Sequence, residues 1–195
     1  VNLIEVYGQK NFAVAYAWAE IDVSAPTTAL LGLGSDDGIK IWLNGKLAHE
    51  NWIGRPVRKD EDLVSLHLSQ GKNQLLIKVQ NMQQGWGFTC RALGSESLAE
   101  KLLSAAGRGD LDTLELLLSH GVDINAKKYG LTALHYAKMK GREDVVKLLL
   151  EKGADANIEM PPKEAIVDAL FNDAIKGDSS GASVLVAQNG EILYK

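Results

Sequence analysis

The sequence predicts a multidomain α+β protein: an antiparallel β-sandwich or jelly roll, then an α-helical repeat unit, then a terminal helix and β-hairpin. Two observations lead to this prediction. Apolar residues recur at every second position through much of the first half, as in half-buried strands, and with helical spacing from residue 98 onward. The expected domain bounds are 1–94 for the sandwich, 95–160 for the repeats and 161–195 for the terminal segment.

Several short segments of the first half alternate as strands do. In NFAVAYAWA the large side chains of Phe12, Val14, Tyr16 and Trp18 share one face, while four alanines share the other. We expect this segment to be a central strand covered on both faces. GIKIWLNGKLAHE has the pattern of a hairpin with Asn44-Gly45 at its turn. Short strands punctuated by turns are typical of a sandwich or jelly roll.

Composition and charge exclude several classes of partner. The 195 residues are 46% hydrophobic, and 21 Lys and Arg stand against 25 Asp and Glu, with no extended basic stripe. We therefore expect neither nucleic acid nor an anionic membrane as a partner. No apolar run is long enough to span a bilayer, and the first residues lack the layout of a signal peptide. Because the chain does not begin with Met, its N-terminus is expected to have been trimmed.

The residues offer little for metal or cofactor chemistry. Cys90 is the single cysteine, which rules out an internal disulfide and a cysteine-rich metal site, and we interpret it as a buried, unreactive thiol. Five acidic residues supply oxygen ligands suited to calcium but lack the spacing of a calcium-binding loop. They are Asp36, Asp37, Asp60, Glu61 and Asp62. No cofactor and no metal are expected.

Four segments of the first half carry a family resemblance. SDDGIKIWLNGK, WIGRP, DEDLVSLHLSQGKNQLLIKVQ and GWGF together resemble the galactose-binding-like jelly rolls, notably the sugar-binding-type domains attached to bacterial glycoside hydrolases. The likeness covers residues 1 to about 93. It implies a jelly-roll fold, whereas sugar binding does not follow, since many such domains are only structural.

A carbohydrate site is one interpretation of the polar and aromatic residues in this region. Aromatic rings stack on sugars while Asp and Arg bond the hydroxyls. The alternative is that Trp42 and Trp86 are core aromatics and that Asp36-Asp37-Gly38 is simply a turn. The candidate carbohydrate-binding residues are Asp36, Asp37, Lys40, Trp42, Trp52, Arg55 and Trp86.

The second half contains an internal repeat. Residues 105–125 align with 136–157, and the paired glycines Gly109 with Gly141 and Gly121 with Gly153 each differ by 32 positions. A period in this range indicates stacked helix pairs. GLTALHYAKMKGREDVVKLLLEKGADAN closely resembles an ankyrin repeat, although alanine stands where the family usually has the proline of its TPLH element.

The ankyrin resemblance implies residue roles and a function class. Thr132 suits the N-cap of the following helix, and His135 is expected to be architectural. The family presents turn tips and a concave face to protein partners. Here the tip carries Lys127, Lys128 and Tyr129, the candidate partner-binding residues. Partner binding and pure scaffolding both remain open, because two repeats bury little surface.

The terminal segment combines a helix with a predicted hairpin. KEAIVDALFNDAIK has helical spacing and is expected to cap the second repeat, and Asn189-Gly190 is a strong hairpin turn. Together with GDSSGASVLVAQNGEILYK it resembles the opening of beta-lactamase-type serine hydrolases. That family's nucleophile lies downstream in a Ser-x-x-Lys motif. The chain is expected to lack this motif and therefore to have no hydrolytic activity, and whether it is a fragment of a longer enzyme is left open.

Two functions follow from the sequence. The first is a non-catalytic accessory segment of a larger bacterial hydrolase-like protein, serving protein interaction or domain positioning. The alternative is a carbohydrate-binding module acting through the jelly-roll aromatics. The resemblance implies a periplasmic or secreted location. For the terminal hairpin three states remain open: disorder, folding back on the jelly roll, and pairing with a second copy in a homodimer.

Overall fold

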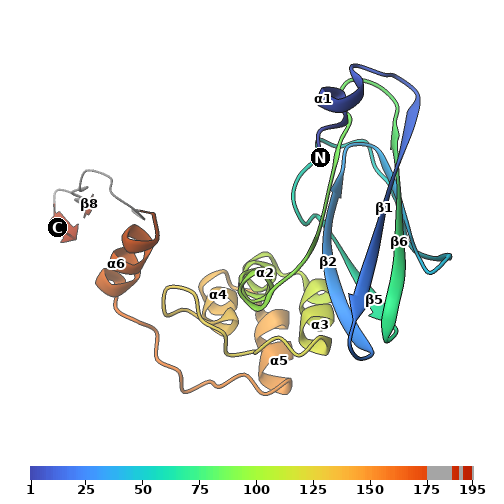
Figure 1. Cartoon of the computed structure of the whole chain (residues 1–195). Helices are drawn as coiled ribbons and strands as arrows, with labels where there is room; N and C mark the ends of the chain where they lie inside the picture. The colour runs from blue at the N-terminus through green and yellow to red at the C-terminus, as the bar shows by residue number, and fades with distance from the viewer. Residues whose placement is uncertain (175–185, 189–190, 195) are drawn as a thin grey trace. The chain divides into compact units, whose positions relative to one another are not determined.

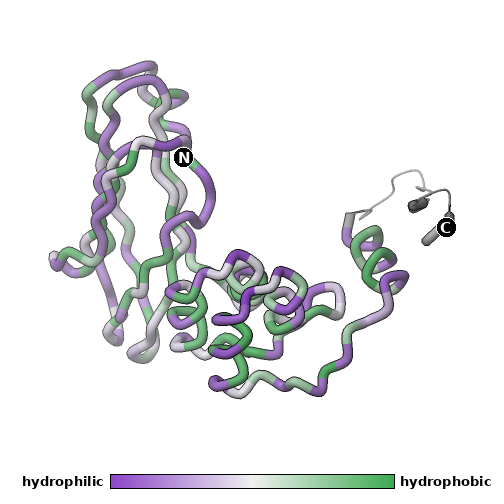
Figure 2. The backbone as a smooth tube through the Cα atoms, turned by 180° about the vertical axis from the view of Figure 1, so that it is seen from behind, coloured by the Kyte–Doolittle hydropathy of each residue, from purple (hydrophilic) through white to green (hydrophobic). Residues whose placement is uncertain are grey.

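The computed structural model describes residues 1–174, 186–188 and 191–194, which form a mixed α and β protein (Figure 1). The chain divides into two compact units, Val1–Gly94 and Ser95–Lys195. Apolar and polar residues are interspersed along the strands of the first unit and the helices of the second (Figure 2). In the part of the chain that the structure describes, no helix has both the length and the apolar character needed to cross a membrane.

Unit 1 contains one short helix and two antiparallel sheets. Helix α1 is Leu3–Tyr7. One sheet has four strands in the order β1-β6-β3-β4, and the other has three in the order β5-β2-β7. The strand bounds are β1 Ala13–Val23, β2 Thr27–Ser35, β3 Gly38–Leu43, β4 Lys46–Trp52, β5 Asp62–Leu68, β6 Gly71–Asn81 and β7 Phe88–Ala92.

Both sheets contribute to a single hydrophobic core. On β6 every second side chain is buried, which is the pattern of a strand with one face toward the core. Leu33 of β2, Ile41 of β3 and Leu66 of β5 are almost completely buried in the same cluster as Val79 of β6. The alternation read from the sequence therefore reports which face of these strands is turned inward.

The expectation for the first long strand is wrong. β1 is an edge strand of the four-stranded sheet rather than a central one, since it pairs only with β6 among the described strands. Its alanine face packs against the core, while Tyr16 and Trp18 on the large face are 63% and 62% exposed. The large side chains thus lie on the solvent-exposed face of the sheet, and the alanines lie on the face that packs against the core.

Unit 2 begins with two helix pairs. α2 (Ser95–Arg108) and α3 (Leu111–Ser119) form the first pair, and α4 (Ala133–Met139) and α5 (Glu143–Glu151) form the second. Their core consists of small and branched apolar side chains at helical spacing. The buried residues include Leu102, Ala106, Leu114, Leu117, Leu134, Ala137, Val145 and Leu149.

Side chains fix the starts of two of these helices. The Asp110 carboxylate accepts a hydrogen bond from the Thr113 N–H at 3.1 Å and so caps α3. Thr132 caps α4, as predicted, in a reciprocal capping box with His135. His135 is buried, accepts from the Thr132 N–H at 3.1 Å through Nδ1, and has its Nε2 3.0 Å from the Ile158 carbonyl. These contacts agree with the architectural role expected for this histidine.

The terminal segment contains a helix and two short strands. α6 spans Lys163–Ala174, directly after the two prolines. β8 (Val186–Gln188) and β9 (Glu191–Tyr194) pair antiparallel. The predicted turn at Asn189-Gly190 lies outside the described residues, as does most of the stretch that resembles serine hydrolases.

Candidate functional sites

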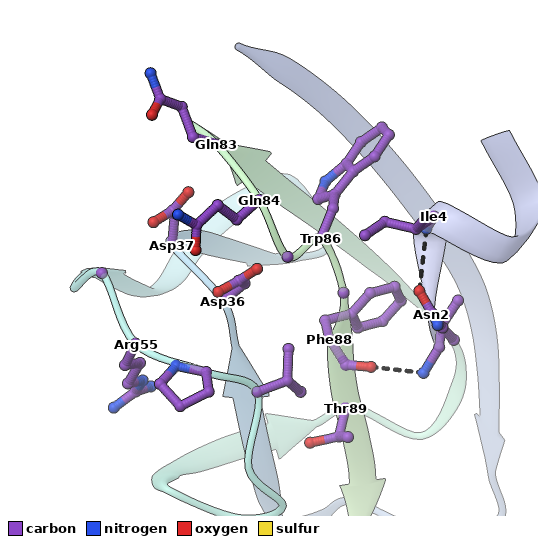
Figure 3. A pocket seen from close by; sticks show the side chains of 16 residues that line it. Asn2, Ile4, Asp36, Asp37, Arg55, Gln83, Gln84, Trp86, Phe88 and Thr89 are labelled. Atoms are coloured by element: carbon purple, nitrogen blue, oxygen red, sulfur yellow. Dashed lines mark hydrogen bonds between the residues drawn. The ribbon is translucent and has the colours of Figure 1, made fainter. Parts of the chain in front are cut away.

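A pocket of about 690 Å³ opens at one end of unit 1 (Figure 3). It is formed where the turn between β2 and β3, the segment after β4, the segment before β7 and the N-terminal residues meet. The lining residues are Val1, Asn2, Ile4, Asp36, Asp37, Gly54, Arg55, Pro56, Val57, Gln83, Gln84, Gly85, Trp86, Gly87, Phe88 and Thr89.

Several buried polar groups in the unit 1 pocket lack hydrogen-bond partners within the described residues, among them Thr89 Oγ1 and the two groups described next. Trp86 is only 5% exposed, yet its indole Nε1–H has none, and neither does Oδ2 of Asp36. Figure 3 shows the indole nitrogen on the side of Gln84 and Asp36. Burial, and then the neighbouring charge of Asp37, raises the pKa of Asp36. An unpaired donor and a desolvated acceptor therefore face one hollow.

Asp37 and Arg55 also line this pocket but have structural partners. Asp37 accepts a hydrogen bond from the Met82 N–H at 2.5 Å, which ties its turn to the end of β6. Arg55 forms an ion pair with Asp62, and its Nε lies 3.0 Å from a carboxylate oxygen of Glu61. Figure 3 shows the Arg55 side chain turned away from Asp36 and Trp86. Arg55 thus belongs to a partly buried ionic cluster beside the pocket.

The other three candidate carbohydrate residues lie elsewhere, on the outer face of the four-stranded sheet. Lys40 forms an ion pair with Glu50 at 2.9 Å, and Trp42 is the cross-strand partner of Leu76. Trp52 covers Gly38, where a Cβ atom would lie only 2.1 Å from the indole ring. The seven predicted residues therefore do not form one site. Alternation along a strand gives the face of each residue but not which loops meet at the sheet's end.

In unit 2 two of the three tip residues, Lys128 and Tyr129, have partners within the unit. Lys128 forms an ion pair with Glu100 of α2, and the Tyr129 hydroxyl donates to Asp173 of α6 at 2.8 Å. The hydrogen bond to Glu100 raises the pKa of Lys128, and the bond to Asp173 raises that of Tyr129. Lys127 is exposed. The tip is thus bonded to both α2 and α6 and is not a free loop.

Beside this tip, two adjoining hollows form a surface that we call the α2 groove. The hollows have volumes of about 600 and 330 Å³ and share Glu96 and Ala99 of α2 as lining residues. The remaining lining residues are Ser95, Leu98, Glu100, His120, Gly121, Val122, Asp123, Ala126, Lys127, Lys128, Tyr129 and Asp173. The sequence analysis missed Glu96 and Ala99, because the repeat pattern identifies the helix but not the groove beside it.

The mixed lining of the α2 groove suits a polar polypeptide. Leu98 and Val122 supply apolar surface, while charged residues line both hollows. Lys128 neutralises Glu100, and the Asp123 side chain accepts from the Asn125 N–H at 2.9 Å. The carboxylates of the groove are Glu96, Glu100, Asp123 and Asp173, and its lysines are Lys127 and Lys128. Acidic groups are therefore in excess.

Two potential nucleophiles have structural explanations. The spacing Ser-x-x-Lys does occur once, from Ser69 to Lys72, which the prediction of a chain without this motif overlooked. There the Ser69 N–H donates to the Asn73 side chain at 3.0 Å in the β5–β6 turn, and Lys72 pairs with Glu20 at 2.7 Å. Cys90 is half-buried, and burial raises the pKa of its thiol. Neither arrangement provides an activated nucleophile.

Stacked helix pairs joined by exposed tips define a repeat protein of the kind that binds other proteins. Residues 61–160 match the family of ankyrin repeats (3 copies), and the chain belongs to that family. The match begins inside unit 1, where the structure has β5, β6 and β7, so the helical repeats themselves start at α2.

The curated relatives match part of this chain, and the two described here are from fowlpox virus and mouse. An ankyrin repeat protein of fowlpox virus, FPV244, is 43% identical over 67 residues, covering 32% of this chain and 10% of the relative. The mouse B-cell lymphoma 3 protein homolog is 30% identical over 107 residues, covering 53% of this chain and 23% of the relative. These relatives give no support to a bacterial origin or to a hydrolase parent.

Among solved structures, the chain is similar to the PA14 domain of the MpAFP antifreeze protein. The TM-score is 0.36 with 15% identity, and the match covers 41% of this chain and 42% of that one. The comparisons do not confirm the jelly-roll and serine hydrolase resemblances. Interaction with proteins is the function class that ankyrin repeats imply.

Proposed function

We propose that the chain is a non-catalytic interaction segment whose α2 groove binds a protein partner. The observation that carries this proposal is the pair of adjoining hollows on either side of Glu96 and Ala99. A preformed concave surface avoids most of the ordering cost of binding. Among its lining residues, Lys128 bonds to Glu100 and Tyr129 bonds to Asp173, and these bonds hold the sides of the groove together.

The charge of the α2 groove suggests the chemistry of the partner. Glu96 and Asp123 remain after Lys128 has neutralised Glu100, and Leu98 and Val122 line the same hollow. A partner segment with lysine or arginine side chains and a few apolar residues would match this lining. We therefore propose an extended basic segment of a protein as the ligand.

Selection from a random peptide library displayed on phage tests this proposal with the whole 195-residue chain as bait. We expect enriched peptides rich in Lys and Arg, and we expect their binding to be lost in a Glu96→Lys variant. Glu115→Lys is the matched control, since Glu115 is exposed on α3 outside the groove. Failure to enrich basic peptides, or equal binding to both variants, would reject the groove as the site.

We also propose that unit 1 is a jelly-roll-type sandwich and that 1–94, 95–160 and 161–195 are three separate parts of the chain. In support, two antiparallel sheets share one core in unit 1. We do not extend the proposal to a bacterial hydrolase-like parent, since the relatives from fowlpox virus, Caenorhabditis elegans and mouse give it no support.

A second function is favoured by the unpaired groups of the unit 1 pocket. Trp86 Nε1–H needs an acceptor and Asp36 Oδ2 needs a donor, and a hydroxyl group serves as both. We propose that a small neutral polyol such as a sugar residue binds there. Asp36 and Trp86 would make the polar contacts, while Lys40, Trp42 and Trp52 lie outside the pocket.

Calorimetric titration with neutral oligosaccharides tests the second function. Trp86→Phe keeps an aromatic ring at this position and removes the indole N–H, so we expect binding to weaken by about tenfold, the effect of one hydrogen bond. Trp52→Phe is the control, because Trp52 does not line the pocket. No saturable heat with the wild type, or equal loss in both variants, would contradict a polyol site.

A further inference from the structure

The two edges of the four-stranded sheet differ in how they are protected. Exposed strand edges pair readily with other chains, and proteins block them with charges, prolines, bulges or short strands. β4 is a short edge strand with a bulge where Ile41 opposes His49 but Trp42 opposes Leu47. It also carries the charges of Lys46 and Glu50. This edge has several of the usual protections.

β1 has none of these protections over most of its length. It is 11 residues long and pairs with β6 in unbroken register from Ala13 to Val23. From Ala13 to Ala19 it contains no charge, proline or glycine. None of the described strands pairs with its other edge. A long, regular and apolar edge of this kind is a template for strand addition.

The side chains of β1 also indicate that the edge is incompletely covered. Ala15 and Ala17 pack against the core yet stay half-buried, whereas their partners Val79 and Ile77 on β6 are buried. On the opposite face Tyr16 and Trp18 are mostly exposed. An added strand would bury apolar surface on both faces.

We propose that the occupant of this edge is β1 of a second copy of the chain, added antiparallel to make an eight-stranded sheet across a two-fold axis. β8 and β9 are only three and four residues long, too short to cover an 11-residue edge. β1 of a second copy has the same length as this edge and the same alternation of alanines and large side chains. Alanines then meet alanines on the core side, and aromatic residues meet on the other face.

Charge selects the antiparallel orientation. The acidic residues of β1, Glu20 and Asp22, lie near its end, and Lys10 lies just before its start. Parallel pairing would bring the two acidic ends together. With Tyr16 on the two-fold axis, antiparallel pairing instead places Lys10 of one copy near Asp22 of the other. Glu20 is already paired with Lys72 at 2.7 Å, so Asp22 is the carboxylate available to this lysine.

Sedimentation equilibrium with the full chain tests this proposal at roughly 100 µM, within reach of a modest protein interface. The expected mass is twice the 21.1 kDa of the chain. Ala19→Lys places a charge on the exposed core-side edge of β1 and should return the mass to that of a monomer. Ala48→Lys is the matched control on the exposed β4 edge and should leave the dimer intact.

Two further observations keep the test decisive. Circular dichroism must show that both lysine variants retain the wild-type fold. Hydrogen exchange in β1 should slow as the wild-type protein is concentrated, because newly paired amides are protected. A wild-type monomer at this concentration, or the same mass for both variants, would overturn the proposal.

Discussion

At the scale of single residues, Asp110 shows how one side chain supports the repeat unit. Its carboxylate caps α3 through the Thr113 N–H. Burial pushes the pKa of Asp110 upward, but the hydrogen bonds from Thr113 and Arg108 outweigh burial and lower the pKa below its ordinary value of 3.8. The charged form is therefore the one that the folded state favours.

This cap predicts a pH-dependent loss of stability. Asp110→Ala should lower the free energy of unfolding by about 1 kcal/mol at neutral pH. Because the folded-state pKa is depressed, the contribution is present above pH 3.8 and is lost as the pH falls through the lowered value. Urea unfolding followed by circular dichroism at neutral and acid pH measures it. A loss that stayed the same in acid would contradict the assignment.

The pKa of Asp36 is shifted in the opposite direction to that of Asp110. Its raised pKa, due first to burial and then to Asp37, means that the folded state favours the protonated acid. That contribution is fully present below pH 3.8 and is lost as the pH rises through the raised value. Asp36→Asn should therefore raise the melting temperature at neutral pH and change it little in acid. An unchanged melting temperature at neutral pH would show that burial and Asp37 do not destabilise the charged carboxylate.

Single residues were predicted unevenly from the sequence. Thr132 and His135 were identified because capping and the ankyrin resemblance are local signals. The partners of Lys128 and Tyr129 were not, since Glu100 and Asp173 are 28 and 44 positions away in the chain. Contacts over such separations depend on how helices pack, which a local pattern does not specify.

At the scale of elements, β1 illustrates the limit of periodicity. Alternation correctly separates Tyr16 and Trp18 from the alanines. Because this part of β1 has no charged face, unlike other strands, alternation does not say which of its faces is inward or whether the strand is central. The order of strands in the sheet depends on pairing with β6, which lies some 50 residues later. For the same reason, the sequence analysis grouped seven carbohydrate-binding candidates that the structure places on two separate surfaces.

Gly38 provides a prediction at this scale. A Cβ atom there would lie 2.1 Å from the Trp52 ring, so Gly38→Ala must displace the tryptophan. We expect a loss of about 1–3 kcal/mol in the free energy of unfolding, as for other overpacked sites. In a Trp52→Ala background the same change should cost much less. Equal costs in the two backgrounds, measured by urea unfolding, would mean that the two residues do not pack together.

At the scale of the whole molecule, each unit has a hydrophobic core of its own. All four tryptophans, at positions 18, 42, 52 and 86, lie in unit 1, while the long helices α2 to α5 lie in unit 2. Tryptophan fluorescence therefore reports on unit 1, and far-ultraviolet circular dichroism is dominated by unit 2. The division into sheets and helical repeats was visible in the change of period near residue 98.

With these two probes, separate unfolding of the two units can be tested. Leu117→Ala removes a fully buried side chain of α3 and should cost about 2–5 kcal/mol. We expect the circular dichroism transition to move to lower temperature while the tryptophan transition keeps its midpoint. A common shift of both transitions would indicate that the chain unfolds as one cooperative unit.

The central claim is that the α2 groove binds a basic protein segment, and the most direct test is the dissociation constant of one selected basic peptide by calorimetry. We predict that Glu96→Lys weakens binding at least about tenfold, or 1.4 kcal/mol, and that added salt weakens wild-type binding. Glu115→Lys should bind like the wild type. The same dissociation constant for Glu96→Lys and the wild type would contradict the account.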